Sequence, residues 1–533
     1  MPDAVVIGSG PNGLVAANLL LDAGWSVEVL EAQEEPGGAV RSDRGVHPDY
    51  VSDVFSAFYP LAAASPVLAR LDLAAEGLRW AHAPRVLAHP LLDGGCAVLE
   101  RRAQDTAAGL AEFAAADADA DADAWQSMYR TWSRIGPDLV QALFTPFPPI
   151  RSGLRLAAKL RASGGLRLAR KLALPVRRLG EEEFAGEGGR LLLAGNALHA
   201  DLAPEAAGSG GFGWLMSMLG QSHGFPVPVG GAGALTAALV SRFERRGGVL
   251  RCGERVASVV VRGGTAVGVV TAGGETVGAR RAVLADTSAP ALYRDLVGEE
   301  HLPSRLVRDL ERFQWDFATF KVDWALTGRV PWTAPGAAGA GTVHLADGVD
   351  GLTRFAAQIA MGHVPDEPFA LFGQMTRADP SRSPAGTESA WAYTHLPQHI
   401  TADAGPDHIT GRWDTRDQEA MADRIEAQVE RFAPGFRALI AARRILAPST
   451  LQAMNENLHN GAINNGTTAL HQQLVFRPTP GTGRPETPVK NLYLASAAAH
   501  PGGGVHGAPG ANAARAALRP RGAQTLLHRA QRV

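Results

Sequence analysis

The N-terminal segment alternates short apolar runs with a glycine-rich turn. Residues 4–7 are all apolar, and the segment GSGPNG follows them directly. Residues 11–23 carry leucine and alanine at helical spacing before Gly24, and a second apolar run, residues 25–30, ends at Glu31. Short apolar runs bounded by turn residues predict buried strands, whereas a repeat of three to four residues predicts a helix. The pattern therefore predicts a strand–turn–helix–strand unit.

Similar patterns return in the middle and at the end of the chain. We predict a helix at about 230–246, a strand at 249–251, and a meander at 255–279 whose turns are Gly-Gly pairs. Apolar strands follow at 282–285 and 491–495. We therefore expect an α/β fold in which a discontinuous Rossmann-type domain receives a partly helical insertion. The predicted division is a dinucleotide-binding domain at 1–100, 226–295 and 451–533, a mostly helical region at 101–225, and a substrate domain at 296–450.

The N-terminal turn has the residue types that bind a dinucleotide. Gly8 permits a tight turn, Gly10 lets the backbone approach a pyrophosphate, and Gly13 lets the helix pack against the strand. Pro11 and Asn12 begin this helix, whose N-terminus favours negative charge. The order of strand, turn and helix makes a true nucleotide site more credible than a fortuitous glycine turn.

The residues after the second strand favour FAD among the dinucleotides. Glu31 lies where a carboxylate accepts hydrogen bonds from the adenosine ribose, and its charge disfavours a 2′-phosphate. Gly37 and Gly38 let the backbone lie against an extended cofactor. Arg41 either neutralises cofactor charge or is a solvated loop arginine.

Two later segments repeat the glycine spacing of the first turn. No strand precedes the copy at 208–213, so we predict a loop there. The copy at 502–507 follows a predicted strand but has no acidic residue after it, so it does not complete a second adenosine site. We place it at the flavin, where the next helix N-terminus stabilises negative charge on the reduced ring. The residues assigned to the flavin are Gly503, Gly504, Val505 and Gly510.

Composition excludes several classes of protein. The formal net charge of -2 gives no global attraction to nucleic acid. The two cysteines, Cys96 and Cys252, form no C-x-x-C pair, which excludes a redox dithiol. Neither a secretory signal nor a long uninterrupted apolar run is visible. We expect a cytoplasmic protein, either free or peripheral on the inner face of the membrane.

These motifs together resemble the phytoene desaturase-like flavoproteins. The resemblance is carried by GSGPNG with Glu31, the Gly-Gly doublet, the GGAGAL segment and the terminal LYLASAAAHPGGGVHGAPGANAA, and it spans essentially the whole chain. Within that family the chain is similar to the branch of pyridine nucleotide-disulfide oxidoreductase domain proteins and desaturase-type carotenoid ketolases. The resemblance implies noncovalent FAD in a domain of glutathione-reductase type, with adenine held by the backbone of Val256. It also implies a lipophilic isoprenoid or polyene substrate. Because no second adenosine site is visible in the sequence, we expect oxygen or a quinone, and not a tightly bound NAD(P), as the electron acceptor.

A basic segment suggests how a lipophilic substrate reaches the protein. Residues 150–180 contain nine cations, interleaved with leucines, and no acid. Two such helices could lie on an anionic membrane surface, with the leucines at the headgroup boundary. The alternative is a solvated basic face over an apolar core. The cations are Arg151, Arg155, Lys159, Arg161, Arg167, Arg170, Lys171, Arg177 and Arg178.

The sequence indicates the reaction more clearly than the residues that assist it. No metal-ligand spacing stands out among the 16 histidines, so we predict no metal site. Hydride removal by flavin needs positioning, exclusion of water and at most one base. His500 and His506 flank the last glycine turn and are the candidates, with a structural role as the alternative. We expect an FAD-dependent oxidoreductase of a hydrophobic substrate; the alternatives are a carotenoid ketolase and a flavin-binding regulatory protein without turnover.

Overall fold

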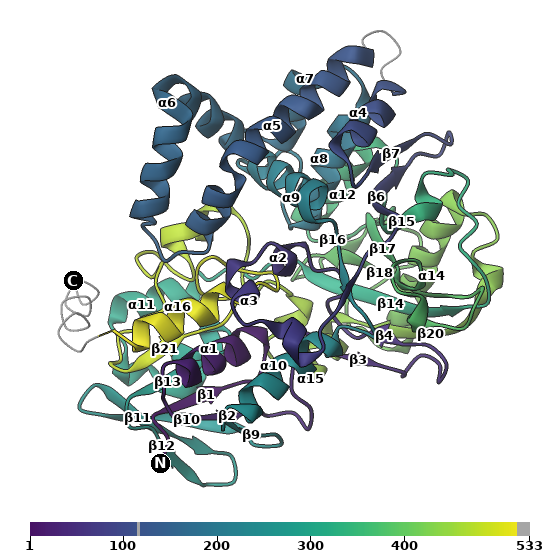
Figure 1. The fold of residues 1–533 in the computed structure, drawn as a ribbon. Coiled ribbons are helices and arrows are strands. Elements are labelled where there is room, and N and C mark those ends of the chain that lie inside the picture. The colour runs from purple at the N-terminus through teal and green to yellow at the C-terminus, as the bar shows by residue number, and fades with distance from the viewer. Residues whose placement is uncertain (114–117, 520–533) are drawn as a thin grey trace.

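The parallel sheet of the cofactor domain is assembled from separated parts of the chain. The computed structural model describes residues 1–113 and 118–519. Five parallel strands lie in the order β21-β13-β1-β2-β9 (Figure 1). The predicted discontinuous Rossmann-type sheet is therefore confirmed. The strand bounds are β1 (Ala4–Ile7), β2 (Val27–Leu30), β9 (Val249–Arg251), β13 (Ala282–Ala285) and β21 (Leu492–Leu494).

Different elements cover the two faces of this sheet. Alternate residues of a strand point to opposite faces, so Val6 packs in one apolar cluster and Val5 in another. The face of Val6 packs on α1 (Pro11–Asp22), α10 (Gly233–Arg245) and α16 (Ala508–Ala517). The face of Val5 packs on the antiparallel meander β10 (Val256–Arg262), β11 (Thr265–Thr271) and β12 (Thr276–Gly278), and on a π-helix (Ala291–Val297).

A second, mixed sheet of seven strands lies beside the first domain (Figure 1). Its order is β20-β14-β18-β17-β15-β6-β7. Strands β6 and β7 fall inside the predicted first part of the cofactor domain, yet they pair in this sheet, because β6 aligns parallel to β15. The bounds are β6 (Arg85–Pro90), β7 (Cys96–Leu99), β14 (Ala318–Leu326), β15 (Ala340–Leu345), β17 (Ala370–Gln374), β18 (Glu388–Leu396) and β20 (Ile440–Leu446).

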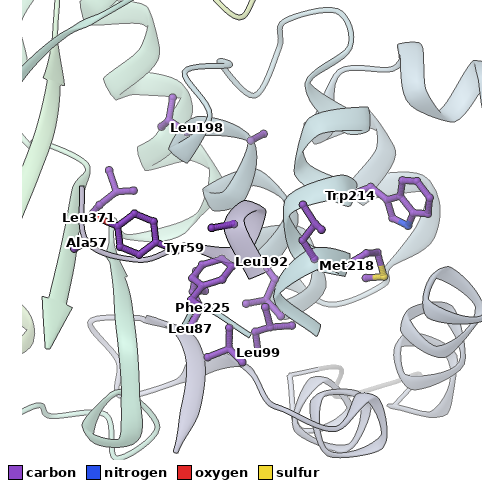
Figure 2. Packing of buried hydrophobic residues seen from close by; sticks show 14 of the residues in the cluster. Ala57, Tyr59, Leu87, Leu99, Leu192, Leu198, Trp214, Met218, Phe225 and Leu371 are labelled. Carbon is purple, nitrogen blue, oxygen red and sulfur yellow. The ribbon is translucent and has the colours of Figure 1, made fainter. Parts of the chain in front are cut away.

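A layer of helices covers the end of the second sheet. In Figure 2, Leu192 and Met218 from two of these helices pack against Leu87 of β6 and Leu99 of β7. None of the helices in the described part of the chain is long and apolar enough to cross a membrane. The bounds are α4 (Ala103–Ala111), α5 (Ala118–Leu143), α6 (Ile150–Ala173), α7 (Val176–Glu183), α8 (Glu187–His199) and α9 (Ser209–His223).

Shorter elements connect these layers. They are β3 (Ser42–Asp43), β4 (Ser52–Asp53), α2 (Pro60–Ala63), α3 (Pro66–Ala69), β5 (Trp80–Ala81), β8 (Val227–Pro228), α11 (Ser304–Glu311), α12 (Gly348–Ala360), β16 (His363–Val364), α13 (Met375–Ala378), β19 (Ala402–Asp403), α14 (Thr415–Phe432) and α15 (Pro448–Met454).

The glycine copy at 208–213 is not a loop, and that prediction was wrong. Gly208 caps the N-terminus of α9, and the following residues are helical. A Cβ atom on Gly213 would lie 2.4 Å from the carbonyl oxygen of Leu193 in α8. The glycines therefore let two helices approach closely, a use of the same spacing that involves no phosphate.

We expect Gly213→Ala to destabilise the fold by about 1–3 kcal/mol, because α8 and α9 would have to separate. Gly109→Ala in α4 is the matched control, since no atom lies within 4 Å of its added Cβ. Alanine is the better helix former, so the control should gain up to about 1 kcal/mol. Urea unfolding of both variants measures the difference; equal midpoints would contradict the close packing.

Candidate active site

One cavity of about 900 Å³ connects the two glycine turns with the second sheet. Its wall includes Gly8 and Glu31 at one end and the turn after β21 farther along. Lys321 of β14 and Tyr393 of β18 contribute from the second sheet. The predicted site residues on the wall are Gly8, Gly10, Pro11, Asn12, Glu31, Gly38, Arg41, Val256, Gly503, Gly504, Val505 and His506.

The carboxylate of Glu31 is fixed by the first turn. Its Oε2 accepts hydrogen bonds from the backbone N–H and the hydroxyl of Ser9, at 2.8 and 2.7 Å. Its Oε1 accepts from the backbone N–H of Gln33 at 2.9 Å. Each carboxylate oxygen has further lone pairs, so the group can still accept from a ribose hydroxyl. Glu31 is thus preorganised at the end of β2.

Asp286 completes the first turn and was missed by sequence reasoning. It follows β13, and its Oδ2 accepts the backbone N–H of Gly13 at 2.8 Å. A Cβ on Gly10 would lie 2.5 Å from the same oxygen, and one on Gly13 would lie 2.3 Å from the carbonyl oxygen of Gly8. Burial, together with the charge of Glu31, raises the pKa of Asp286 to about 7, although the hydrogen bond from Gly13 lowers it in part. In the sequence, this role of Asp286 could have been recognised from an acidic residue directly after a strand that borders β1.

The turn after β21 meets an amide side chain in the cavity. A Cβ on Gly503 would lie 2.1 Å from Oδ1 of Asn464, so only glycine fits against this group. The Nδ2 group of Asn464 donates to Oδ2 of Asp201 at 2.5 Å, which orients the amide. Asn464 comes from an amide-rich stretch and lines the cavity.

Both candidate histidines form hydrogen bonds with backbone groups. Nδ1 of His506 accepts the N–H of Ala508 at 3.1 Å, and Nε2 donates to the carbonyl of Gly503 at 3.2 Å. Nε2 of His500 donates to the carbonyl of Thr145 at 3.0 Å, and His500 is not on the cavity wall. Burial lowers the pKa of each imidazole to about 4. This geometry favours the structural alternative for both residues.

Three further predicted residues lie behind the wall. Gly13 supports the first turn, as described above. The N–H of Gly37 donates to the carbonyl of Ser9 at 3.1 Å. A Cβ on Gly510 would lie 1.9 Å from the carbonyl oxygen of Asn12, so Gly510 joins α16 to α1. The structure thus places Gly510 at a contact between helices, away from the position at the flavin that its sequence context predicts.

Arg41 is a wall residue with a fixed guanidinium. Its Nη2 donates to the carbonyl of Met454 at 3.2 Å, and the guanidinium lies over the ring of Phe55 at 5.2 Å. These contacts distinguish it from a solvated loop arginine.

Lys321 is a buried cation on the wall that the sequence analysis also missed. Its Nζ donates to the carbonyl of Asp53 at 2.8 Å and pairs with Asp323. Burial lowers the pKa of Lys321, whereas Asp323 opposes that shift. The stacked rings of Trp391 and Tyr393 lie beside it, with Nζ 5.9 Å from the Trp391 ring. The signal was a Lys-x-Asp pair inside the otherwise apolar strand ATFKVDWAL.

One part of the wall is apolar. Leucines line it from α5, α6, α9 and the segment after residue 468. Leu470 and Leu474 also expose 43% of their surface, so they stand where the cavity opens. The apolar wall residues are Leu139, Leu143, Leu172, Phe212, Leu215, Leu470 and Leu474.

Comparison with known proteins agrees with this geometry. Residues 12–518 match the family described as flavin containing amine oxidoreductase. Pyridine nucleotide-disulfide oxidoreductase domain-containing protein 2 of Mus musculus is 29% identical over 97% of this chain and 93% of its own. Phytoene desaturase (neurosporene-forming) of Cereibacter sphaeroides is 25% identical over 97% of this chain and 94% of its own.

The solved structure of cyclohexylamine oxidase from Brevibacterium oxydans is similar in fold, with a TM-score of 0.59 at 15% identity over 100% of both chains. The resemblance to the phytoene desaturase-like flavoproteins is thereby confirmed. The chain belongs to the flavin containing amine oxidoreductase family and is an FAD-dependent oxidoreductase.

Proposed function

We propose that the protein removes hydride from an apolar, isoprenoid- or polyene-like substrate and passes the electrons to oxygen or a quinone. The observation that carries the proposal is the leucine-lined part of the cavity, which opens at Leu470 and Leu474. A wall of this kind favours an apolar ligand through burial of surface. The names of the phytoene desaturases among the relatives point the same way.

The residues along the cavity fit FAD. Glu31 stands at the adenosine end, and the N-terminus of α1, which favours negative charge, lies beside the first turn. Buried polar groups without a hydrogen-bond partner are costly, so a polar ligand is expected beside them. FAD supplies the acceptor for the hydride. The wall atoms that have no partner among the described residues are Asn12 Oδ1, Arg41 Nε, Thr287 Oγ1, Thr319 Oγ1 and Asn465 Oδ1.

We infer that peripheral contact of the protein with a membrane delivers such a substrate. This contact depends more on exposed apolar side chains than on the positive charge of residues 150–180. Three exposed apolar residues lie on α6, Ile150, Leu154 and Leu166, and Phe476 is exposed near the opening. Six of the nine cations predicted to face lipid are instead paired with acids, which reduces the net charge of the segment. The pairs are Arg155 and Lys159 with Asp138, Arg170 and Arg178 with Glu182, Lys171 with Glu183, and Arg177 with Glu205.

The substrate proposal is tested by anaerobic mixing of the holoprotein with phytoene in vesicles. We expect the absorbance of oxidised flavin to bleach, whereas putrescine should leave it unchanged. Bleaching by putrescine alone would overturn the proposal. Flavin that neither compound reduces would favour the regulatory alternative, and an oxygenated product would favour the ketolase.

The affinity for FAD should fall as the pH rises through about 7. Asp286 is protonated below that pH because burial raises its pKa, and above it the carboxylate repels the pyrophosphate. The loss should approach tenfold per pH unit. Asp286→Asn keeps an acceptor for Gly13 and should abolish the dependence, whereas the control Asp49→Asn, at an exposed position outside the cavity wall, should retain it. Equilibrium dialysis of FAD against apoprotein measures this, and an unchanged profile in Asp286→Asn would refute the assignment.

Flotation with vesicles tests the membrane contact. Wild-type protein should float with neutral as well as anionic vesicles, and Leu154→Asp and Phe476→Asp should each reduce the floated fraction severalfold because a charge cannot enter the apolar layer. Leu92→Asp is the matched control at an exposed leucine outside this surface. Absence of flotation by the wild type would exclude the contact.

A further inference from the structure

Three histidines, two of them fully buried, form a series that begins at the cavity wall. His199 is the last residue of α8, His344 lies on β15, and His89 lies on the neighbouring strand β6. His199 lines the cavity, and its Nδ1 is 3.2 Å from Nε2 of His344. Nε2 of His199 has no hydrogen-bond partner among the described residues and is free to meet a ligand in the cavity. His89 and His344 are fully buried.

Two ring nitrogens in this series have no hydrogen-bond partner among the described residues, and both lie close to Gly195. They are Nδ1 of His344 and Nδ1 of His89. A Cβ on Gly195, one helical turn before His199, would lie 2.6 Å from the first and 3.3 Å from the second. Buried polar atoms of this kind are normally satisfied by an ordered water, provided that the site is polar and has room. The two imidazoles lie on either side of Gly195 without a direct hydrogen bond between them.

The far end of the series lies near the surface. Nε2 of His89 is 3.0 Å from the carbonyl oxygen of Ala346, which accepts only, so this nitrogen carries a hydrogen and Nδ1 of His89 is an acceptor. When each ring donates its hydrogen bond away from the cavity, His344 and His199 both carry their hydrogen on Nδ1. Nε2 of His199 then presents a lone pair to the cavity. Asp347, the next residue after Ala346, is exposed.

We propose that His199 is the base of the reaction, and that the hydrogen bond from its Nδ1 to Nε2 of His344 leaves its Nε2 as the acceptor toward the cavity. This proposal rests on the oxidation proposed above. One C–H bond of the substrate gives its electron pair and hydrogen to FAD as hydride. The adjacent C–H bond gives its proton to Nε2 of His199, and the electron pair left behind forms the carbon–carbon double bond. Of the two histidines predicted from the sequence, His506 has both ring nitrogens bonded to backbone, and His500 is not on the cavity wall.

The surroundings keep the series neutral, which is the state in which a ring nitrogen accepts a proton. Burial lowers the pKa of His199 to about 3 and of His89 to about 4, and it lowers the pKa of His344 well below its ordinary value. A weak base is sufficient here, because loss of hydride leaves positive charge on carbon and makes the adjacent C–H bond strongly acidic. Asp347 raises the pKa of His89, which opposes part of the effect of burial.

Other titratable groups face the series from β18 and from the segment after α8. The ring of Tyr393 is 6.3 Å from that of His199. A positive charge on His395 would lower the pKa of His199, and Nδ1 of His395 is 3.1 Å from Oδ1 of Asp201. Among the described residues no group of histidines, cysteines or acids could hold a metal ion, so the three imidazoles are not a metal centre.

The hydrogen positions are tested without turnover by long-range ¹⁵N–¹H spectra of ¹⁵N-histidine-labelled holoprotein. We expect His199 and His344 to carry hydrogen on Nδ1 and His89 on Nε2, and all three to remain neutral from pH 5 to 9. His344→Gln should shift the His199 signals, whereas the exposed His301→Gln control should not. A hydrogen on Nε2 of His199, or titration of His199 near pH 6.5, would overturn the proposal.

Kinetics with phytoene test the chemical role. His199→Gln should slow flavin reduction by about 10²–10⁴-fold, as for loss of a general base, with FAD content unchanged. His344→Gln should slow flavin reduction less than His199→Gln does, because the base remains and only its hydrogen-bond partner changes. Equal rates in His199→Gln and wild type would refute the role of His199. If phytoene fails to reduce wild-type flavin, the substrate proposal fails, and the spectra still decide the hydrogen positions.

Discussion

The close approach of three chain segments at the first glycine turn is the constraint on which the rest of the structure depends. The turn after β1, the end of β13 and the start of α16 meet there without room for side chains: a Cβ on Gly13 or Gly510 would lie within 2.3 Å of a backbone oxygen. Asp286 adds a buried hydrogen bond from the N–H of Gly13. Because these segments come from the beginning, middle and end of the sequence, their packing closes the cofactor domain and determines where the intervening chain leaves and returns.

A buried group of charged residues attaches the second sheet to the cofactor domain. Oδ1 of Asp53 accepts the N–H of Ala232, which precedes α10, at 2.7 Å and lies 3.1 Å from Nη1 of Arg382. The carbonyl of Asp53 accepts from Lys321 in the second sheet. A buried charge is tolerated where such partners surround it. This group therefore holds the second sheet against the cofactor domain and places Lys321 on the cavity wall.

Local patterns predict much of the cofactor domain because its pieces are locally distinctive. The strand at 4–7, the helix after it and the Gly-Gly turns of the meander each carry a signal within a few residues, and each is present. Pairing across the chain has no such signal. Strands β6 and β7 join the second sheet through β15, some 250 residues away in sequence, and the glycine copy at 208–213 packs helices. Identical spacing can thus serve phosphate binding or helix packing, according to what lies opposite.

The sequence by itself determined the kind of cofactor and the position of its adenosine end, because the first turn and Glu31 lie on consecutive elements of one local unit. Tertiary structure alone decided which other groups reach the cavity. Asp286, Lys321 and His199 come from three distant segments, and His506 lies at the predicted place but has both nitrogens occupied by its own turn. The physical reason is that a side chain acquires chemistry from its neighbours. Burial, hydrogen-bond partners and free lone pairs are properties of the packed molecule, and residue type and spacing do not contain them.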